Sequence, residues 1–160
     1  MRKMLKVLLV IIACQISATV WAQTIFIVRH AEKIDESRDP LLSLKGKQRA
    51  MNLAMHLRDA DIKRVYTTEF QRTQMTAAPL ADVRQLASTP YAAKESLSFG
   101  KTLLTTDANT LVVGHSNTLL DILKGMGITD VKPVADDEYD RLIIVTLNKN
   151  ASPTYTLLRY

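Results

Sequence analysis

Four residues that can bind an oxyanion follow apolar segments of the chain. Arg29 and His30 come directly after the apolar run 24–28, and His115 comes soon after the run 110–113. Arg72 follows a third such segment, 63–67. Loops at the carboxyl ends of strands are where open α/β sheets place their functional groups. Two arginines, whose planar forks suit phosphate oxygens, together with two imidazoles predict a pocket for a phosphate group.

The segments that must position these residues alternate between strand-like and helix-like patterns. Strands are predicted over 24–28, 63–67, 110–113, 141–147 and 154–159, and the last two are joined by the turn-rich stretch 148–153. Helices are predicted from Ser43, as N-cap, to residue 60 and over 70–81, 100–106 and 117–126, the last ended by Gly127. Residues 83–98 are ambiguous. The alternation predicts an α/β fold, a three-layer α/β/α sandwich around a mostly parallel mixed sheet.

The first 22 residues have the pattern of a secretory signal peptide. A basic start precedes an apolar run, and small residues close the segment at Ala22. The run is interrupted by polar residues and is shorter than the ~20 apolar residues of a spanning helix, which disfavours a membrane anchor. The alternative is lipid attachment at Cys14, the only cysteine. We therefore expect a signal peptide over 1–22 and one domain over 23–160, exported to the periplasm or secreted, with no stable membrane span in the mature chain.

Charge and composition exclude some classes of partner. Removal of the signal peptide takes away three basic residues and no acidic one, so a net charge of +5 falls to +2. No basic run with interleaved aromatic residues remains, and we expect no nucleic-acid partner. His56, inside a helical pattern, is expected on the surface, and Met51, Met55 and Met75 are expected to fill the core rather than to bind a metal.

Four motifs resemble those of the histidine phosphatase superfamily, also called the phosphoglycerate mutase-like superfamily. The segment 28–32, which contains Arg29 and His30, resembles the opening motif. The segments 42–50, 68–77 and 113–117 are similar to the first-helix, second-arginine and second-histidine motifs. The four occur in family order across nearly the whole predicted domain, which is a much stronger indication than any one of them alone.

The resemblance assigns a role to each residue of the predicted pocket. His30 would attack phosphorus as a neutral imidazole and become a phosphohistidine. Arg29 and Arg72 would bind the phosphate oxygens, and His115, if protonated, would donate another hydrogen bond. Ser116 and Asn117 open a helix and could also reach the phosphate. We expect no metal and no other cofactor, because the arginines supply the positive charge.

The acid that protonates the leaving group is expected to be Glu95. Larger family members carry a glutamate shortly before an aromatic-glycine pair, and Phe99-Gly100 is such a pair. Glu95 lies one residue farther from the pair than this pattern, and Ser96 occupies the matching position. Other candidates for the acid are Glu32, Asp137 and Glu138.

These observations predict a metal-independent phosphatase of the small, exported branch 1 type. It would hydrolyse phosphate esters, phosphohistidine or phosphoanhydrides through a phosphohistidine on His30, with a small-molecule or glycan phosphate as substrate. The alternative is a non-catalytic module that binds a phosphate ligand or a partner on the same fold. The sequence carries no signal for an oligomeric state.

Overall fold

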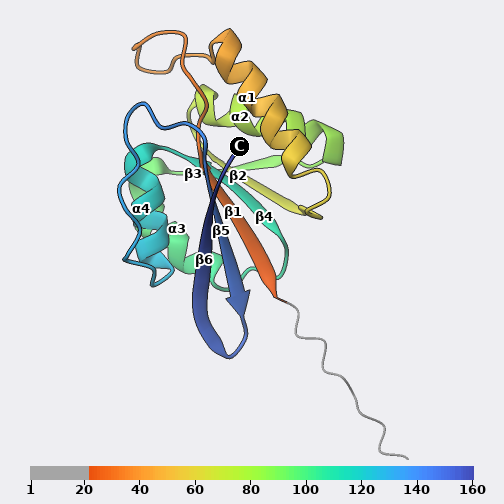
Figure 1. The fold of residues 1–160 in the computed structure, drawn as a ribbon, viewed down its shortest axis with the longest axis vertical. Coiled ribbons are helices and arrows are strands. Elements are labelled where there is room, and N and C mark those ends of the chain that lie inside the picture. Colours follow the sequence, from red (N-terminus) through yellow and green to blue (C-terminus); the bar gives the residue numbers. More distant parts are fainter. Residues whose placement is uncertain (1–21) are drawn as a thin grey trace, which may run out of the picture.

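The computed structural model describes residues 22–160, which form a mixed sheet of six strands between two pairs of helices (Figure 1). The predicted signal peptide, with Cys14, lies outside the described residues apart from Ala22. The strand order is β3-β2-β4-β1-β5-β6. The strands are β1 (Gln23–Arg29), β2 (Arg64–Thr68), β3 (Ser88–Tyr91), β4 (Thr110–Gly114), β5 (Arg141–Asn148) and β6 (Ala151–Arg159). The first four run parallel, and β5 and β6 add two antiparallel strands at one edge.

Two helices cover each face of the sheet. One face carries α1 (Leu44–His56) and α2 (Gln71–Arg84), and the other carries α3 (Ser96–Leu103) and α4 (Ser116–Gly125) (Figure 1). A short 3-10 helix, η1 (Ala93–Glu95), precedes α3. These elements confirm the three-layer α/β/α sandwich with a mostly parallel sheet.

Strand β1 shows why the central strands are apolar throughout. Ile25 and Ile27 pack into the core beneath α3 and α4, whereas Phe26 and Val28 pack beneath α1 and α2. Successive side chains of a strand point to opposite faces, so a strand covered on both faces needs apolar residues at every position. The nucleophile candidate therefore follows one of the most rigidly packed segments of the chain.

The elements depart from the sequence predictions at two helices and at both edge strands. Helix α1 ends at His56 rather than at residue 60, and α3 spans Ser96–Leu103 rather than 100–106. The ambiguous stretch 83–98 contains β3, which includes Pro90 and lies at one edge of the sheet. Strand β6 begins at Ala151 rather than at residue 154, includes Pro153 and lies at the other edge. A proline cannot donate a ladder hydrogen bond, and an edge strand tolerates this because one side has no neighbour.

The prediction that Met51 and Met55 fill the core is wrong. They are 46% and 62% exposed, because α1 buries the side that carries Ala50 and Leu53. Met75 packs partly buried against Leu42 and its neighbours, and His56 is exposed as predicted. Within residues 22–160, no helix combines the length and hydropathy that crossing a membrane would require.

Candidate active site

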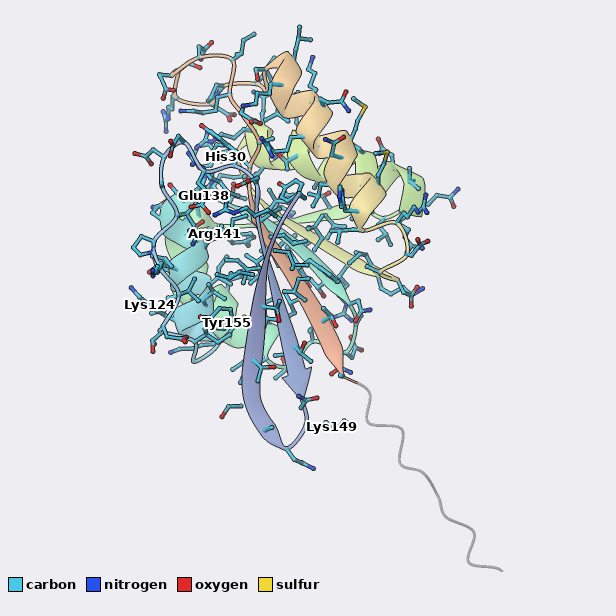
Figure 2. All side chains as sticks on the ribbon, viewed as in Figure 1. His30, Lys124, Glu138, Arg141, Lys149 and Tyr155 are labelled. Atoms are coloured by element: carbon cyan, nitrogen blue, oxygen red, sulfur yellow. The ribbon has the colours of Figure 1, made fainter. Side chains whose placement is uncertain are left out.

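The carboxyl ends of three parallel strands meet around one polar pocket. Arg29 and His30 come from the end of β1, His115 from the end of β4, and Arg72 from the first turn of α2 after β2. Figure 2 shows His30 at this end of the molecule. The cavity has a volume of about 280 Å³ and is lined by Arg29, His30, Lys33, Ser37, Arg38, Pro40, Arg72, His115, Ser116, Asn117 and Asp136. The structure thus brings together the six predicted residues around the phosphate.

His30 is buried and prepared as a neutral nucleophile. Its Nδ1 lies 2.8 Å from the carbonyl oxygen of Ala31, which can only accept, so Nδ1 carries the proton and Nε2 holds a free lone pair. Its backbone N–H donates to the carbonyl of Gly114 at 2.9 Å, which ties the end of β1 to the end of β4. Burial lowers the pKa of His30 to about 3, and repulsion from His115, Arg29 and Arg72 acts in the same direction. At neutral pH the ring is therefore uncharged.

Backbone carbonyls and an aromatic ring hold Arg29 without neutralising it. Its Nη1 donates to the carbonyl oxygens of Ala135 at 2.9 Å, Asp136 at 2.8 Å and Glu138 at 3.3 Å. The guanidinium lies over the ring of Tyr139, 4.2 Å from its centre. Its Nε is buried and has no hydrogen-bond partner among the described residues. Arg29 thus keeps both charge and donor capacity for an anion.

Arg72 is held in a similar way. Its Nη1 lies 3.4 Å from the carbonyl oxygen of Arg38 and 3.8 Å from the carboxylate of Asp39, and its guanidinium stacks 4.3 Å from the ring centre of Phe70. Its buried Nε also has no partner among the described residues. Burial lowers the pKa of the Arg72 guanidinium from its ordinary value, although the group stays charged at any physiological pH. Arg72 thus lines the pocket with no carboxylate of the described residues within hydrogen-bonding distance.

A buried hydroxyl chain orients His115. Its Nε2 lies 3.0 Å from Thr68 Oγ1, which in turn lies 2.9 Å from Thr73 Oγ1. Thr73 donates to the carbonyl oxygen of Phe70 at 2.7 Å, so Thr68 donates to Thr73 and accepts from His115 Nε2–H. Burial, followed by the charges of Arg72 and Arg29, lowers the pKa of His115 to about 4. The unliganded ring is therefore neutral, and the expected protonated donor requires the charge of a bound phosphate.

The matched family accounts for this arrangement. The family model for branch 1 of the histidine phosphatase superfamily matches residues 25–101, which include Arg29, His30 and Arg72. His115 follows the matched range, and the structure places it 5.3 Å from His30 between ring centres. The chain belongs to the histidine phosphatase superfamily.

Solved structures of phosphatases share its fold. The protein histidine phosphatase SixA, determined with tungstate, is 18% identical over 86% of this chain and 97% of its own, with a TM-score of 0.68. YhfR of Bacillus stearothermophilus is 14% identical over 86% of this chain and 96% of its own, with a TM-score of 0.67. A phosphoserine phosphatase of Entamoeba histolytica is 12% identical over 86% and 97%, with a TM-score of 0.64. None of the curated proteins matches the chain significantly in sequence.

Arginines bind two of the carboxylates that were candidates for the general acid, those of Glu32 and Glu138. Glu32 accepts from Arg49 at 2.8 to 3.0 Å and lies 3.3 Å from Lys45. Burial opposes its ionisation, but the hydrogen bonds and charge of Arg49, a backbone hydrogen bond and the contact with Lys45 together outweigh burial and lower the pKa of Glu32. Hydrogen bonds from Arg141, at 2.6 and 2.7 Å, likewise lower the pKa of Glu138. Both groups hold the structure together and are not proton donors.

The structure does not bring the other two candidates into the pocket. Glu95 is exposed in η1, and Asp137 is exposed in the loop before β5; neither lines the cavity. Among the residues that line the described pocket, the one carboxylate is that of Asp136. Asp136 was not among the residues predicted from the sequence, although Asp137 and Glu138, which follow it, were.

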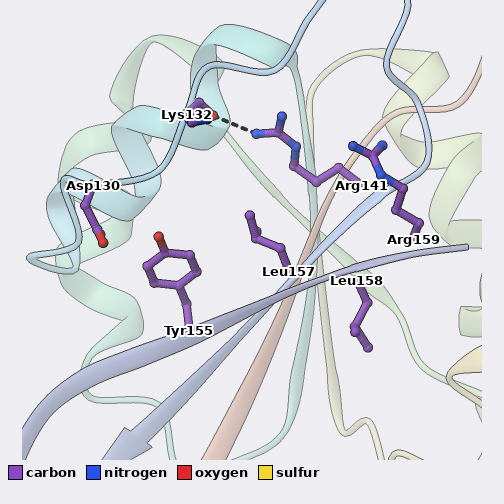
Figure 3. Close-up of a pocket in the computed structure, with 7 residues that line it drawn as sticks. All are labelled: Asp130, Lys132, Arg141, Tyr155, Leu157, Leu158 and Arg159. Carbon is purple, nitrogen blue, oxygen red and sulfur yellow. Dashed lines mark hydrogen bonds between the residues drawn. The ribbon is translucent and has the colours of Figure 1, made fainter.

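A second, larger cavity lies on the other side of the loop that contacts Arg29. It has a volume of about 640 Å³ and is lined by Asp130, Lys132, Arg141, Tyr155, Leu157, Leu158 and Arg159 (Figure 3). It contains no histidine, and its two arginines are paired with Glu138 and Asp140. Size alone therefore does not identify the active site. Within residues 22–160, no group of three or more His, Cys, Asp or Glu side chains is arranged to hold a metal ion.

Proposed function

We propose that this protein is a metal-independent phosphatase that forms a phosphohistidine on His30. The observation that carries the proposal is the state of His30: buried, neutral, with Nδ1 bonded to a carbonyl and Nε2 free in a pocket that holds two arginines. Membership of the histidine phosphatase superfamily supports the same chemistry.

In the first step, His30 Nε2 attacks phosphorus, the N–P bond forms, and the bond from phosphorus to the leaving group breaks. Arg29 and Arg72 stabilise the charge on the phosphoryl oxygens, since both line the pocket and carry guanidinium N–H groups. In the second step, water attacks phosphorus, the N–P bond breaks, and inorganic phosphate leaves with His30 again neutral. Ser116 and Asn117, at the start of α4, add donors to the pocket.

The proposed substrates are phosphate esters, with phosphohistidine and phosphoanhydrides as further members of the class. Among proteins of similar fold, one is a protein histidine phosphatase and another a phosphoserine phosphatase, so the fold accepts both kinds of phosphate. Small-molecule and glycan phosphates are the substrates we favour for an exported enzyme. A non-catalytic binding module is less consistent with the residues, because the nucleophile and both arginines are present.

Export is part of the proposal. Residues 1–22 would direct the chain across a membrane and be removed after Ala22, leaving a mature protein that starts at Gln23. The intact mass of the protein purified from its native host tests this. A mass that starts at Gln23 supports export by cleavage, whereas a lipid-modified Cys14 at the N-terminus would replace it with a lipid anchor.

The experiment that tests the catalytic proposal is hydrolysis of 4-nitrophenyl phosphate in excess chelator. We expect activity in the wild type and in His56→Ala, whose exposed histidine lies outside the pocket. His30→Ala should lose at least about 10³-fold in kcat/KM, since the nucleophile is gone. The wild type should acquire a covalent phosphate that is acid-labile and base-stable, and His30→Ala should not. Equal activity in His30→Ala would refute the mechanism, and one phosphorylation without turnover would favour the binding module.

A further inference from the structure

Asp136 is the one acidic residue among those that line the described pocket of His30. The residue is exposed to solvent, and its side chain forms no hydrogen bond or ion pair with other described residues. Every other acidic residue considered above is either bound to an arginine or outside the pocket. A carboxyl group that is free of partners beside a reacting phosphate is able to exchange protons with it.

The backbone around Asp136 is fixed from the side of the pocket. The Asp136 carbonyl accepts from Arg29 Nη1 at 2.8 Å, with those of Ala135 and Glu138 on the same nitrogen at 2.9 and 3.3 Å. Since Arg29 immediately precedes the nucleophile, this contact sets the position of Asp136 relative to His30. A catalytic group needs such fixed support, because a displacement of about 1 Å can cost ~10²-fold in rate.

The same loop is fixed from its other side by Glu138. The Glu138 backbone N–H donates to the Ala135 carbonyl at 3.0 Å, and its carboxylate accepts from the Ala135 N–H at 3.3 Å, which closes a tight turn over Asp136. Arg141 and Arg159 hold that carboxylate at 2.6 and 3.0 Å. Figure 2 shows Glu138 and Arg141 near the end of the sheet that carries His30, and Figure 3 shows Arg141 and Arg159 beyond the loop. The turn that carries Asp136 is therefore clamped between Arg29 and two arginines.

We propose that Asp136 is the general acid and base of this enzyme, a role that rests on the phosphatase function proposed above. As His30 Nε2 bonds to phosphorus and the P–O bond breaks, the Asp136 carboxyl gives its proton to the leaving oxygen, which departs as an alcohol. As water then attacks the phosphohistidine, the Asp136 carboxylate takes one proton from that water while the N–P bond breaks. The acid is restored for the next cycle, and the products are an alcohol and inorganic phosphate.

The electrostatics of the pocket favour this exchange. A bound phosphate dianion favours the protonated form of a carboxyl group beside it, because two like charges repel. Departure of the alcohol and transfer of phosphate to His30 changes that charge distribution and allows the proton to move. The four cationic side chains at the cavity, Arg29, Lys33, Arg38 and Arg72, hold the phosphate in place despite the nearby carboxyl.

The test compares two substrates whose leaving groups differ in their need for a proton. The variant is Asp136→Asn, which keeps the shape of the side chain but cannot donate a carboxyl proton. Its matched control is Asp137→Asn, which makes the same change one residue away, outside the pocket. The substrates are 2-glycerol phosphate, whose alkoxide is a poor leaving group, and 2,4-dinitrophenyl phosphate, whose leaving group departs without a proton.

We expect Asp136→Asn to lower kcat/KM for 2-glycerol phosphate by about 10² to 10⁴-fold and to leave 2,4-dinitrophenyl phosphate within about 3-fold in its first step. Asp137→Asn should change neither. An equal loss on both substrates, or no loss on either, would overturn the acid role while leaving the phosphatase intact. So would a wild type that hydrolyses only the dinitrophenyl ester. A wild type that hydrolyses neither substrate would instead overturn the proposed function itself.

Discussion

Two pairs of arginines in this protein have the same side chain and opposite electrostatic surroundings. Arg49 and Arg141 are each held by a carboxylate, from Glu32 at 2.8 Å and Glu138 at 2.6 Å. Arg29 contacts backbone carbonyls and the ring of Tyr139 instead, and the nearest recorded carboxylate of Arg72 is 3.8 Å away. In the folded chain, carboxylates balance the charges of Arg49 and Arg141, whereas the charges of Arg29 and Arg72 have no such close partner.

The difference identifies where an anion belongs. Burying a guanidinium without a counter-charge costs free energy, and a fold keeps such a group where a ligand supplies the charge. Carbonyl oxygens and aromatic faces orient the guanidinium without balancing its positive charge. Carboxylates both orient the guanidinium and balance its charge. The pocket of His30 is therefore suited to an anion, because its two arginines lack close carboxylate partners. The two arginine–carboxylate pairs are structural. The predictions below test this division.

The largest expected effect is a loss of catalysis when an arginine without a close carboxylate partner is removed. Arg72→Ala should lower kcat/KM for 4-nitrophenyl phosphate by about 10³-fold, since it removes a donor to the charge of the transition state. Its stability should change little, because no carboxylate loses a close partner. Steady-state kinetics and thermal unfolding of the same sample check both parts. A large loss of stability with nearly normal activity would place Arg72 among the structural arginines.

Glu32→Gln, at a carboxylate that pairs with an arginine, is expected to lower stability and to leave activity nearly unchanged. Its side chain is 12% exposed and binds Arg49 through both oxygens. Breaking a buried pair leaves one charge without a partner, and we expect unfolding to become easier by about 3 kcal/mol. Chemical denaturation measures this, and activity below the unfolding temperature should stay within about 5-fold. The control is Asp59→Asn, at an exposed pair with Arg58 outside the pocket, which should change neither quantity.

The pocket residues and the central strands could be predicted from the sequence, but the carboxylate–arginine pairs could not. The six residues around the phosphate were predicted because each directly follows a strand or opens a helix, and parallel strands necessarily gather their carboxyl ends. The central strands were predicted from continuous apolar runs. These features depend on local pattern, and local pattern is what one sequence contains.

The acid could not be placed from the sequence, for a physical reason. Glu95, Glu32 and Glu138 have the right chemical type, but their use depends on the fold: Glu95 lies outside the pocket, and arginines bind Glu32 and Glu138. Arg49 is 17 residues from Glu32, and no local pattern relates the two. Asp136 lines the pocket, and its backbone carbonyl accepts a hydrogen bond from Arg29, which is 107 residues away. Long-range partners of this kind decide between catalytic and structural carboxylates.

The two neutral histidines of the pocket should make the free energy of unfolding depend on pH. Burial lowers the pKa of both His30 and His115 below 6.5, so at acidic pH the unfolded chain binds protons that the folded chain does not. Their contribution is complete above pH ~6.5 and is lost as the pH falls, by about 1.5 kcal/mol per histidine between pH ~6.5 and ~5.

Chemical denaturation across this pH range tests the assignment. His115→Asn should unfold with a shallower dependence on pH than the wild type, while Glu32 and Glu138 contribute equally to both proteins. His56→Asn, at an exposed position, serves as the matched control. An unchanged slope in His115→Asn would mean that folding does not lower the pKa of this ring, which would contradict the effect of burial.

The smallest expected effect concerns the ring that orients Arg29. Tyr139 lies under the guanidinium at 4.2 Å, and its ring centre is 6.1 Å from that of His30. A cation–π contact of this kind contributes about 1 kcal/mol, so Tyr139→Leu should lower kcat/KM by about 5-fold. Tyr139→Phe keeps the aromatic face and should stay within about 2-fold. Steady-state kinetics on 4-nitrophenyl phosphate distinguishes the two. Equal losses in both variants would assign the effect to the phenolic hydroxyl, and Arg29 would then depend on its carbonyl partners alone.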